Sequence, residues 1–98
     1  MKIYNKYLIC YDIEDDKIRR KFFEKMKDFG LVSIQKSVFY GDLTVPELTA
    51  MKNFAFELLD QGADKCLWIR CNLDECDVQN CIGYKDFRYM EPDGHATI

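Results

Sequence analysis

The apolar run from Tyr7 to Ile13 constrains the fold more than any other part of the sequence. It forms the second half of a strand predicted over residues 3–13, and its near-continuous apolar character is typical of a central strand covered on both sides. Asp12 interrupts this run. Because an ionised carboxylate away from water must be paired, hydrogen-bonded or bound to a cation, we expect Asp12 to have a specific role.

Two helices are predicted from capping residues and apolar spacing. Asp15 or Asp16 can cap a first helix that ends at Gly30. Its apolar residues recur at helical spacing, at Ile18, Phe22, Met26 and Phe29. The segment Thr44–Glu47 is a capping-box sequence with an early proline, and the apolar face that follows it continues to Gly62.

The remaining segments complete an alternating order. Strands are predicted at Leu31–Gln35, Ser37–Asp42 and Cys66–Cys71, and a short edge strand is expected at Tyr84–Met90. The order strand-helix-strand-strand-helix-strand predicts an α+β fold of the ferredoxin-like type, with one antiparallel sheet and both helices on one face. We assign residues 1–90 to this domain and residues 91–98 to a flexible C-terminal tail. Because this fold serves many functions, the function must be argued from the site.

Composition adds three expectations. The seven Phe, six Tyr and one Trp are many for a chain of 98 residues, and such aromatic content favours a subunit that buries part of it in a homodimer. An apolar stretch of about 18 residues and a signal-peptide pattern are both missing, so we expect a cytoplasmic protein without a membrane span. Five cysteines, an odd number, fit reduced thiols in that compartment, and their spacing is not that of zinc or iron-sulfur sites.

Charge is distributed unevenly along the chain. Residues 1–36 hold nine Lys or Arg against six Asp or Glu, whereas residues 37–98 hold five against eleven. Basic residues cluster directly after Asp12, at Lys17, Arg19, Arg20 and Lys21. This cluster suits phosphate groups, and the acidic second half suits a basic partner protein. The cluster also fits the solvated face of an amphipathic helix.

Two sequence blocks together resemble a known family. The first is Tyr7–Ile13 with the basic cluster that follows it, and the second is Gln35–Leu43, which reads Gln-Lys-Ser-Val-Phe-Tyr-Gly-Asp-Leu. With Gly30 between them, they are similar to the small CRISPR-associated Cas-two family, which works with the spacer integrase. The resemblance spans about residues 7–83. Either block alone is a weak signal, but the two rarely coincide at this separation in a chain of this length.

The resemblance implies a homodimer with facing sheets, in which Asp12 of each chain lies near its symmetry mate. Family members are credited with divalent-metal-dependent cleavage of RNA or DNA and with bridging integrase dimers across a DNA duplex. The resemblance therefore implies that Asp12 is the catalytic residue and the ligand of Mg²⁺ or Mn²⁺, since two carboxylates at a two-fold axis can hold one ion. The nucleic-acid-binding residues would be Lys17, Arg19, Arg20 and Lys21, with Tyr11, Ser37 and Phe39 in supporting roles.

Simpler interpretations exist for the same residues. Asp12 could be a structural carboxylate that accepts backbone N–H groups at a strand end. Ser37 could be a hydroxyl in a strand link and Phe39 a core aromatic. Ser33 stands at a position that is often basic in similar proteins, so we expect bridging rather than cleavage to be the cellular role. The alternative functions are a toxin-like ribonuclease of ferredoxin-like fold and a noncatalytic interaction scaffold.

Overall fold

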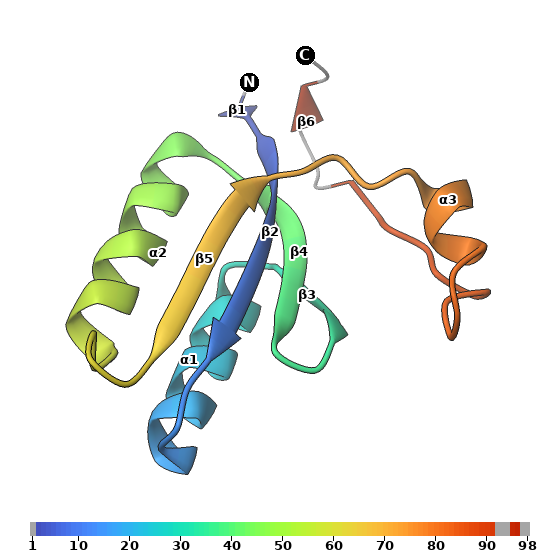
Figure 1. The fold of residues 1–98 in the computed structure, drawn as a ribbon. Coiled ribbons are helices and arrows are strands. Elements are labelled where there is room, and N and C mark those ends of the chain that lie inside the picture. The colour runs from blue at the N-terminus through green and yellow to red at the C-terminus, as the bar shows by residue number, and fades with distance from the viewer. Residues whose placement is uncertain (1, 92–94, 97–98) are drawn as a thin grey trace.

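A computed structural model describes residues 2–91 and 95–96 of the chain. The elements are, in chain order (Figure 1), β1 (Lys2–Ile3), β2 (Asn5–Asp12), α1 (Asp16–Asp28), β3 (Val32–Gln35), β4 (Val38–Leu43), α2 (Val45–Leu58), β5 (Lys65–Arg70), α3 (Glu75–Gln79) and β6 (His95–Ala96). None of the described helices combines the length and apolar character that a membrane span needs.

Four strands form one antiparallel sheet in the order β3-β4-β2-β5, which makes β2 a central strand as predicted. The predicted α+β, ferredoxin-like order of β2, α1, β3, β4, α2 and β5 is therefore confirmed. The short strands β1 and β6 pair separately, in parallel, through Lys2 with His95 and Ile3 with Ala96.

Local sequence signals explain the two long helices. The Asp15 side chain caps α1 by accepting a 3.0 Å hydrogen bond from the backbone N–H of Ile18. The chain leaves α1 through Gly30, whose φ of 85° is readily adopted only by glycine. A complete capping box begins α2, because Thr44 and Glu47 each bond to the backbone N–H of the other.

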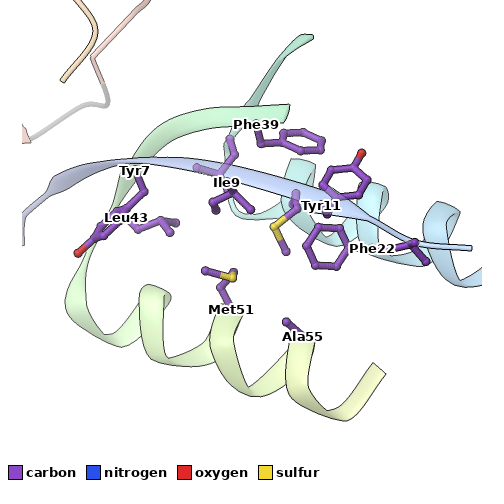
Figure 2. Packing of buried hydrophobic residues seen from close by; sticks show 11 residues of the cluster. Tyr7, Ile9, Tyr11, Phe22, Phe39, Leu43, Met51 and Ala55 are labelled. Carbon is purple, nitrogen blue, oxygen red and sulfur yellow. The ribbon is translucent and has the colours of Figure 1, made fainter. Parts of the chain in front are cut away.

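The core lies between the sheet and the two helices (Figure 2). Alternate residues of β2, namely Tyr7, Ile9 and Tyr11, point from the sheet toward the helices. They pack with buried residues of β4 and the helices, which are Phe22, Met26, Phe39, Leu43, Met51 and Ala55. The expectation that β2 is covered on both sides is wrong within one chain, because only alternate residues of the strand are buried. The opposite face of the sheet, called here the open face, is therefore available for other contacts.

The C-terminal part of the chain differs from the prediction. Tyr84–Met90 forms no strand, and a short helix, α3, precedes it in a stretch where none was expected. Instead of pairing at an edge, this segment is held by side-chain bonds, such as the 2.9 Å bond from the Tyr84 hydroxyl to the carbonyl oxygen of Ile34. The flexible tail predicted for residues 91–98 falls mostly on residues outside the described part and stays a prediction. Glu91 bonds to Lys6.

Candidate nucleic-acid and metal site

The open face has two ends that differ in what covers them. Strand pairing places Lys6 opposite Asp42 at one end, where the segment after β5 crosses the sheet. It places Asp12 opposite Lys65 at the other end. The end with Lys6, Asp42 and Tyr40 is called here the covered end. The end with Asp12 and Lys65 is called the uncovered end. Each pair points to the same face because residues in register on adjacent strands share a face.

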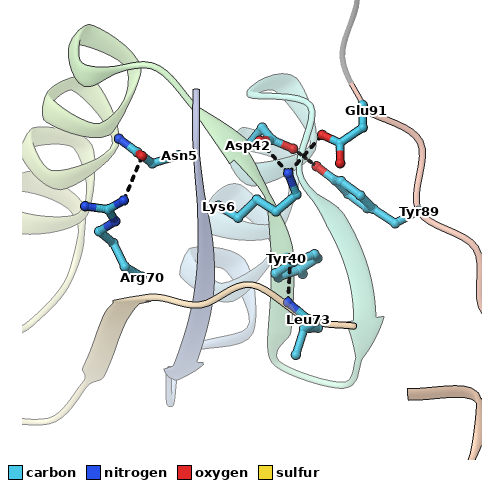
Figure 3. Close-up of polar contacts among 8 residues, drawn as sticks. All are labelled: Asn5, Lys6, Tyr40, Asp42, Arg70, Leu73, Tyr89 and Glu91. Carbon is cyan, nitrogen blue, oxygen red and sulfur yellow. Dashed lines mark hydrogen bonds and ion pairs between the residues drawn. The ribbon is translucent and has the colours of Figure 1, made fainter. Parts of the chain in front are cut away.

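Polar side chains of the covered end bond to the C-terminal part of the chain (Figure 3). The Asp42 carboxylate, whose side chain is 2% exposed, accepts a hydrogen bond from the Tyr89 hydroxyl and lies 3.4 Å from Lys6 Nζ. Lys6 also binds Glu91 at 2.9 Å, and the Tyr40 hydroxyl accepts the backbone N–H of Leu73 at 2.9 Å. These bonds attach the C-terminal segment to the sheet, so this end is structural.

The covered end perturbs two titrating groups. Burial raises the pKa of Tyr89 far above its ordinary value, and the hydrogen bond to Asp42 and the charge of Asp42 raise it further. Burial lowers the pKa of Lys6, but the hydrogen bond to Glu91 and the charges of Asp42 and Glu91 outweigh it, so the pKa is raised overall. Both groups therefore stay protonated, and the network keeps its donors at neutral pH.

The uncovered end holds Asp12, and its position corrects one expectation. Asp12 is not enclosed by the apolar strand, because it is the last residue of β2 and is exposed to water. In the described part of the chain its carboxylate accepts no hydrogen bond and forms no ion pair. The structure therefore gives no support to the interpretation of Asp12 as a structural carboxylate. The buried carboxylate of this sheet is Asp42 instead.

The basic cluster lies on α1, just after the uncovered end. Lys17, Arg20 and Lys21 are exposed, whereas Arg19 is half-buried and bonds to neighbouring residues of the chain. The Arg19 guanidinium donates a 3.0 Å bond to the carbonyl oxygen of Ile13 and binds the Asp16 carboxylate. Arg19 thus fixes the start of the helix beside the strand end. Among the described residues, the other three basic side chains of the cluster have no hydrogen-bond or ion-pair partner, so they can meet a phosphate.

The three supporting residues have structural environments. Tyr11 and Phe39 are in the core with ring centroids 6.1 Å apart, and burial raises the pKa of Tyr11 although the charge of Arg19 lowers it. Ser37 has a φ of 64°, and its carbonyl oxygen accepts the backbone N–H of Tyr11 at 3.0 Å. This bond brings the second sequence block to the end of β2, next to Asp12.

Sequence reasoning missed Asp42, Tyr89 and Lys65. Asp42 lies in the Gly-Asp-Leu part of the second block, where its acidic side chain between a glycine and a leucine in a predicted strand was an available signal. The glycine at position 41 of the same block has a structural reason, because the Cβ of any other residue there would lie 2.9 Å from the Leu31 side chain. The partners Tyr89 and Lys65 had no local signal, since only strand pairing and the return of the chain place them.

The donor set at the uncovered end fits a hard cation only in part. An exposed carboxylate suits Mg²⁺, which keeps several of its waters. Burial raises the pKa of the neighbouring Cys66 to about 11, so its thiol stays neutral and is a poor ligand. Among the described residues, no three His, Cys, Asp or Glu side chains come together as a metal site. One chain thus offers Asp12 as one ligand, and a second copy would add another.

Comparison with known proteins supports the family suggested by these blocks. The family model for CRISPR associated protein Cas2 matches residues 5–79. The CRISPR-associated endoribonuclease Cas2 1 of Francisella tularensis subsp. novicida (strain U112) is 35% identical over 98 residues, which is 100% of both chains.

Solved structures agree with this fold. A hypothetical protein, TT1823, from Thermus thermophilus has a TM-score of 0.66 and 32% identity over 70% of this chain and 83% of its own. Cas2 of Streptococcus pyogenes has a TM-score of 0.62 and 22% identity over 68% of this chain and 86% of its own. The sequence match over most of the chain and the shared fold show that this chain belongs to the CRISPR-associated Cas2 family, named above as Cas-two.

Proposed function

We propose that this chain acts as a homodimer that binds duplex DNA and bridges the spacer integrase during CRISPR adaptation. The observation that carries the proposal is the uncovered end of the open face, where Asp12 is exposed and from which the chain enters α1 with its exposed basic residues. Family membership favours this role over a toxin-like ribonuclease.

The dimer is proposed from the apolar residues of the open face. Leu67 and Ile69 of β5 are 47% and 53% exposed, and they share this face with Leu8 and Cys10 of β2. A second copy related by a two-fold axis would cover these residues and bring the two Asp12 side chains near each other. The segment Tyr84–Met90, predicted as an edge strand, takes no part in this proposal, since it is not a strand.

Light scattering tests the dimer. We expect a dimeric mass at micromolar concentration for the wild type and a monomeric mass for Ile69→Lys, because the new charge would be buried in the interface. Val45→Lys is the matched control, since Val45 is 68% exposed at the start of α2, away from the open face. A monomeric wild type would refute the dimer and, with it, a shared metal ion.

Duplex binding is proposed from the exposed residues Lys17, Arg20 and Lys21. Their contacts would be with phosphates, so affinity should be independent of sequence and should fall steeply with salt. Arg20→Ala should lower affinity for every duplex alike and reduce the salt slope by about 1. Arg88→Ala serves as a control on the C-terminal segment, and equal effects of the two variants would remove α1 from the DNA interface.

Phosphodiester cleavage is a second candidate, favoured by the exposed and unengaged carboxylate of Asp12. Asp12 of both chains would hold Mg²⁺ or Mn²⁺, which when bound lowers the pKa of a water and offsets charge on the phosphoryl group. The chain's own basic residues would hold the phosphate backbone of RNA or DNA over this pair.

Asp12→Asn separates cleavage from bridging, because it keeps the shape of the side chain and removes its charge. We expect it to abolish Mg²⁺-dependent cleavage of RNA or DNA while it leaves the dimer and duplex binding in place. For the cellular role we expect bridging, so spacer acquisition should survive this change. A folded, dimeric Asp12→Asn protein that fails in acquisition would contradict the bridging role.

A further inference from the structure

A lysine that the proposed function leaves unused lies at the uncovered end. We propose that Lys65 is a phosphate-binding residue of the Asp12 site and that Asp64 holds it in position. This inference rests on the proposed binding of nucleic acid, which it deepens by adding a contact at the uncovered end, apart from helix α1.

Strand pairing puts Lys65 directly beside Asp12. The two residues are partners in the β2·β5 register, so both side chains leave the sheet on the open face. They line one shallow cavity of about 270 Å³, whose walls are Cys10, Tyr11, Asp12, Lys65, Cys66 and Leu67. Since the paired strand ends meet at this edge of the sheet, a ligand that contacts Asp12 also comes within reach of Lys65.

The Lys65 ammonium is available for an external anion. None of the described carboxylates lies within ion-pair distance of it. Its register partner Asp12 forms no ion pair with it in the described structure, and the carboxylate of its chain neighbour Asp64 bonds to backbone N–H groups. An exposed ammonium with three donors and no internal partner suits a phosphate oxygen.

Asp64 fixes the backbone on which Lys65 stands. Its Oδ1 accepts the backbone N–H of Glu14 at 3.0 Å, and its Oδ2 accepts the backbone N–H of Asp60 at 3.0 Å. The first bond joins the start of β5 to the residues that follow β2, and the second closes the turn after α2. Asp64 is therefore a positioning residue that holds the two strand ends, and with them Lys65 and Asp12, side by side.

The pair also resolves an electrostatic problem of the proposed site. A lone carboxylate repels a phosphate backbone, and a two-fold axis would bring two carboxylates together. A lysine beside each Asp12 offsets that repulsion before any cation binds. It also supplies a charged contact to phosphate. Ser33, exposed on β3 at a position that is often basic in similar proteins, carries no charge for such a contact.

Fluorescence anisotropy without divalent ions tests the contact, using a labelled DNA duplex and a labelled single-stranded RNA of the same length. For at least one probe we expect Lys65→Met to remove one phosphate contact. At about 0.1 M salt this would weaken binding of the duplex roughly eightfold and lower its salt slope by about 0.9, or weaken binding of the single strand roughly fivefold and lower its slope by about 0.7. Lys65→Arg should restore both values. Lys85→Met is the control, because Lys85 is an exposed lysine of the C-terminal segment.

The double variant tests the role of Asp64. If Asp64 acts through Lys65, Asp64→Ala should weaken binding in the wild type and have no further effect in Lys65→Met, because the two changes are then non-additive. A merely structural role of Asp64 would give the same loss in both backgrounds and would refute its positioning role.

The outcomes separate the two levels of the proposal. A wild type that binds neither probe would overturn the proposed function together with the role of Lys65. A wild type that binds, with Lys65→Met indistinguishable from Lys85→Met on both probes, would overturn the role of Lys65 alone.

Discussion

Each end of the open face carries one aspartate and one lysine on adjacent strands, but the two pairs differ in burial and in bonding. At the covered end, Asp42 and Lys6 face each other across β4 and β2, form an ion pair and lie under Tyr89. At the uncovered end, Asp12 and Lys65 face each other across β2 and β5, and both are exposed, with no ion pair to any residue that the structure describes. The same chemistry thus stabilises the fold at one end and stays free for a ligand at the other.

The comparison shows why burial alone separates a structural carboxylate from a candidate functional one. Buried charges are expensive, so a fold keeps them only with full sets of partners, as at Asp42. An exposed and unengaged pair contributes little to stability, as at Asp12 and Lys65. Changes at the covered end should therefore appear in unfolding experiments, and changes at the uncovered end in binding experiments.

The largest difference is expected between Asp42→Ala and Asp12→Ala. Asp42→Ala leaves the Tyr89 hydroxyl without its acceptor and Lys6 without one of its carboxylates, which should cost about 3 kcal/mol of unfolding free energy. Asp12→Ala should change it by less than about 0.5 kcal/mol. Urea unfolding at one protein concentration measures both, because the stability of a dimer depends on concentration. Equal losses would erase the distinction between the two ends.

A moderate effect is expected at alkaline pH. The pKa of Tyr89 and the pKa of Lys6 are raised in the folded chain, so the folded state retains protons that the unfolded state releases. Their contribution to stability is complete below about pH 10 and is lost as pH rises above it. Tyr89→Phe should cost about 1 kcal/mol at neutral pH and should make the alkaline loss smaller, as measured by unfolding across pH. An unchanged alkaline profile in Tyr89→Phe would assign the loss to other groups.

The smallest effect is expected at Ser37. This residue lies next to Asp12, so its substitution tests whether the binding site of the uncovered end extends to the Ser37 side chain. Its φ of 64° strains any residue except glycine, so Ser37→Gly should raise stability by up to about 1 kcal/mol, less the added entropy of the unfolded chain. Because the contact with Tyr11 uses the backbone carbonyl, nucleic-acid binding should not change. A loss of binding in Ser37→Gly would instead give its hydroxyl a direct role.

The parts of the fold that sequence predicts correctly are those with local causes. The caps at Asp15 and Thr44 and the apolar spacing of the helices are encoded within a few residues, and both helices form there. The central position of β2 follows from its apolar run. The proposed catalytic and metal role of Asp12 is not tested by the structure and stays a prediction.

The parts that sequence misses depend on distant contacts. The aromatic residues of Tyr84–Met90 favour a strand by residue type. In the structure Tyr84 bonds to Ile34 and Tyr89 to Asp42, so tertiary bonds decide the conformation of the segment. Asp12 was expected to be enclosed because its neighbours are apolar, yet it ends the strand in water. Lys65 gains its place beside Asp12 only through strand register.

Titration with Mn²⁺, followed by electron paramagnetic resonance, tests most directly the claim that the uncovered end is the functional one. We predict one bound ion per dimer in the wild type, the same in Asp42→Asn after correction for its folded fraction, and none in Asp12→Asn. An Asp12→Asn protein that binds Mn²⁺ as the wild type does would contradict the claim, and a wild type without a bound ion would refute the shared metal ion at this end.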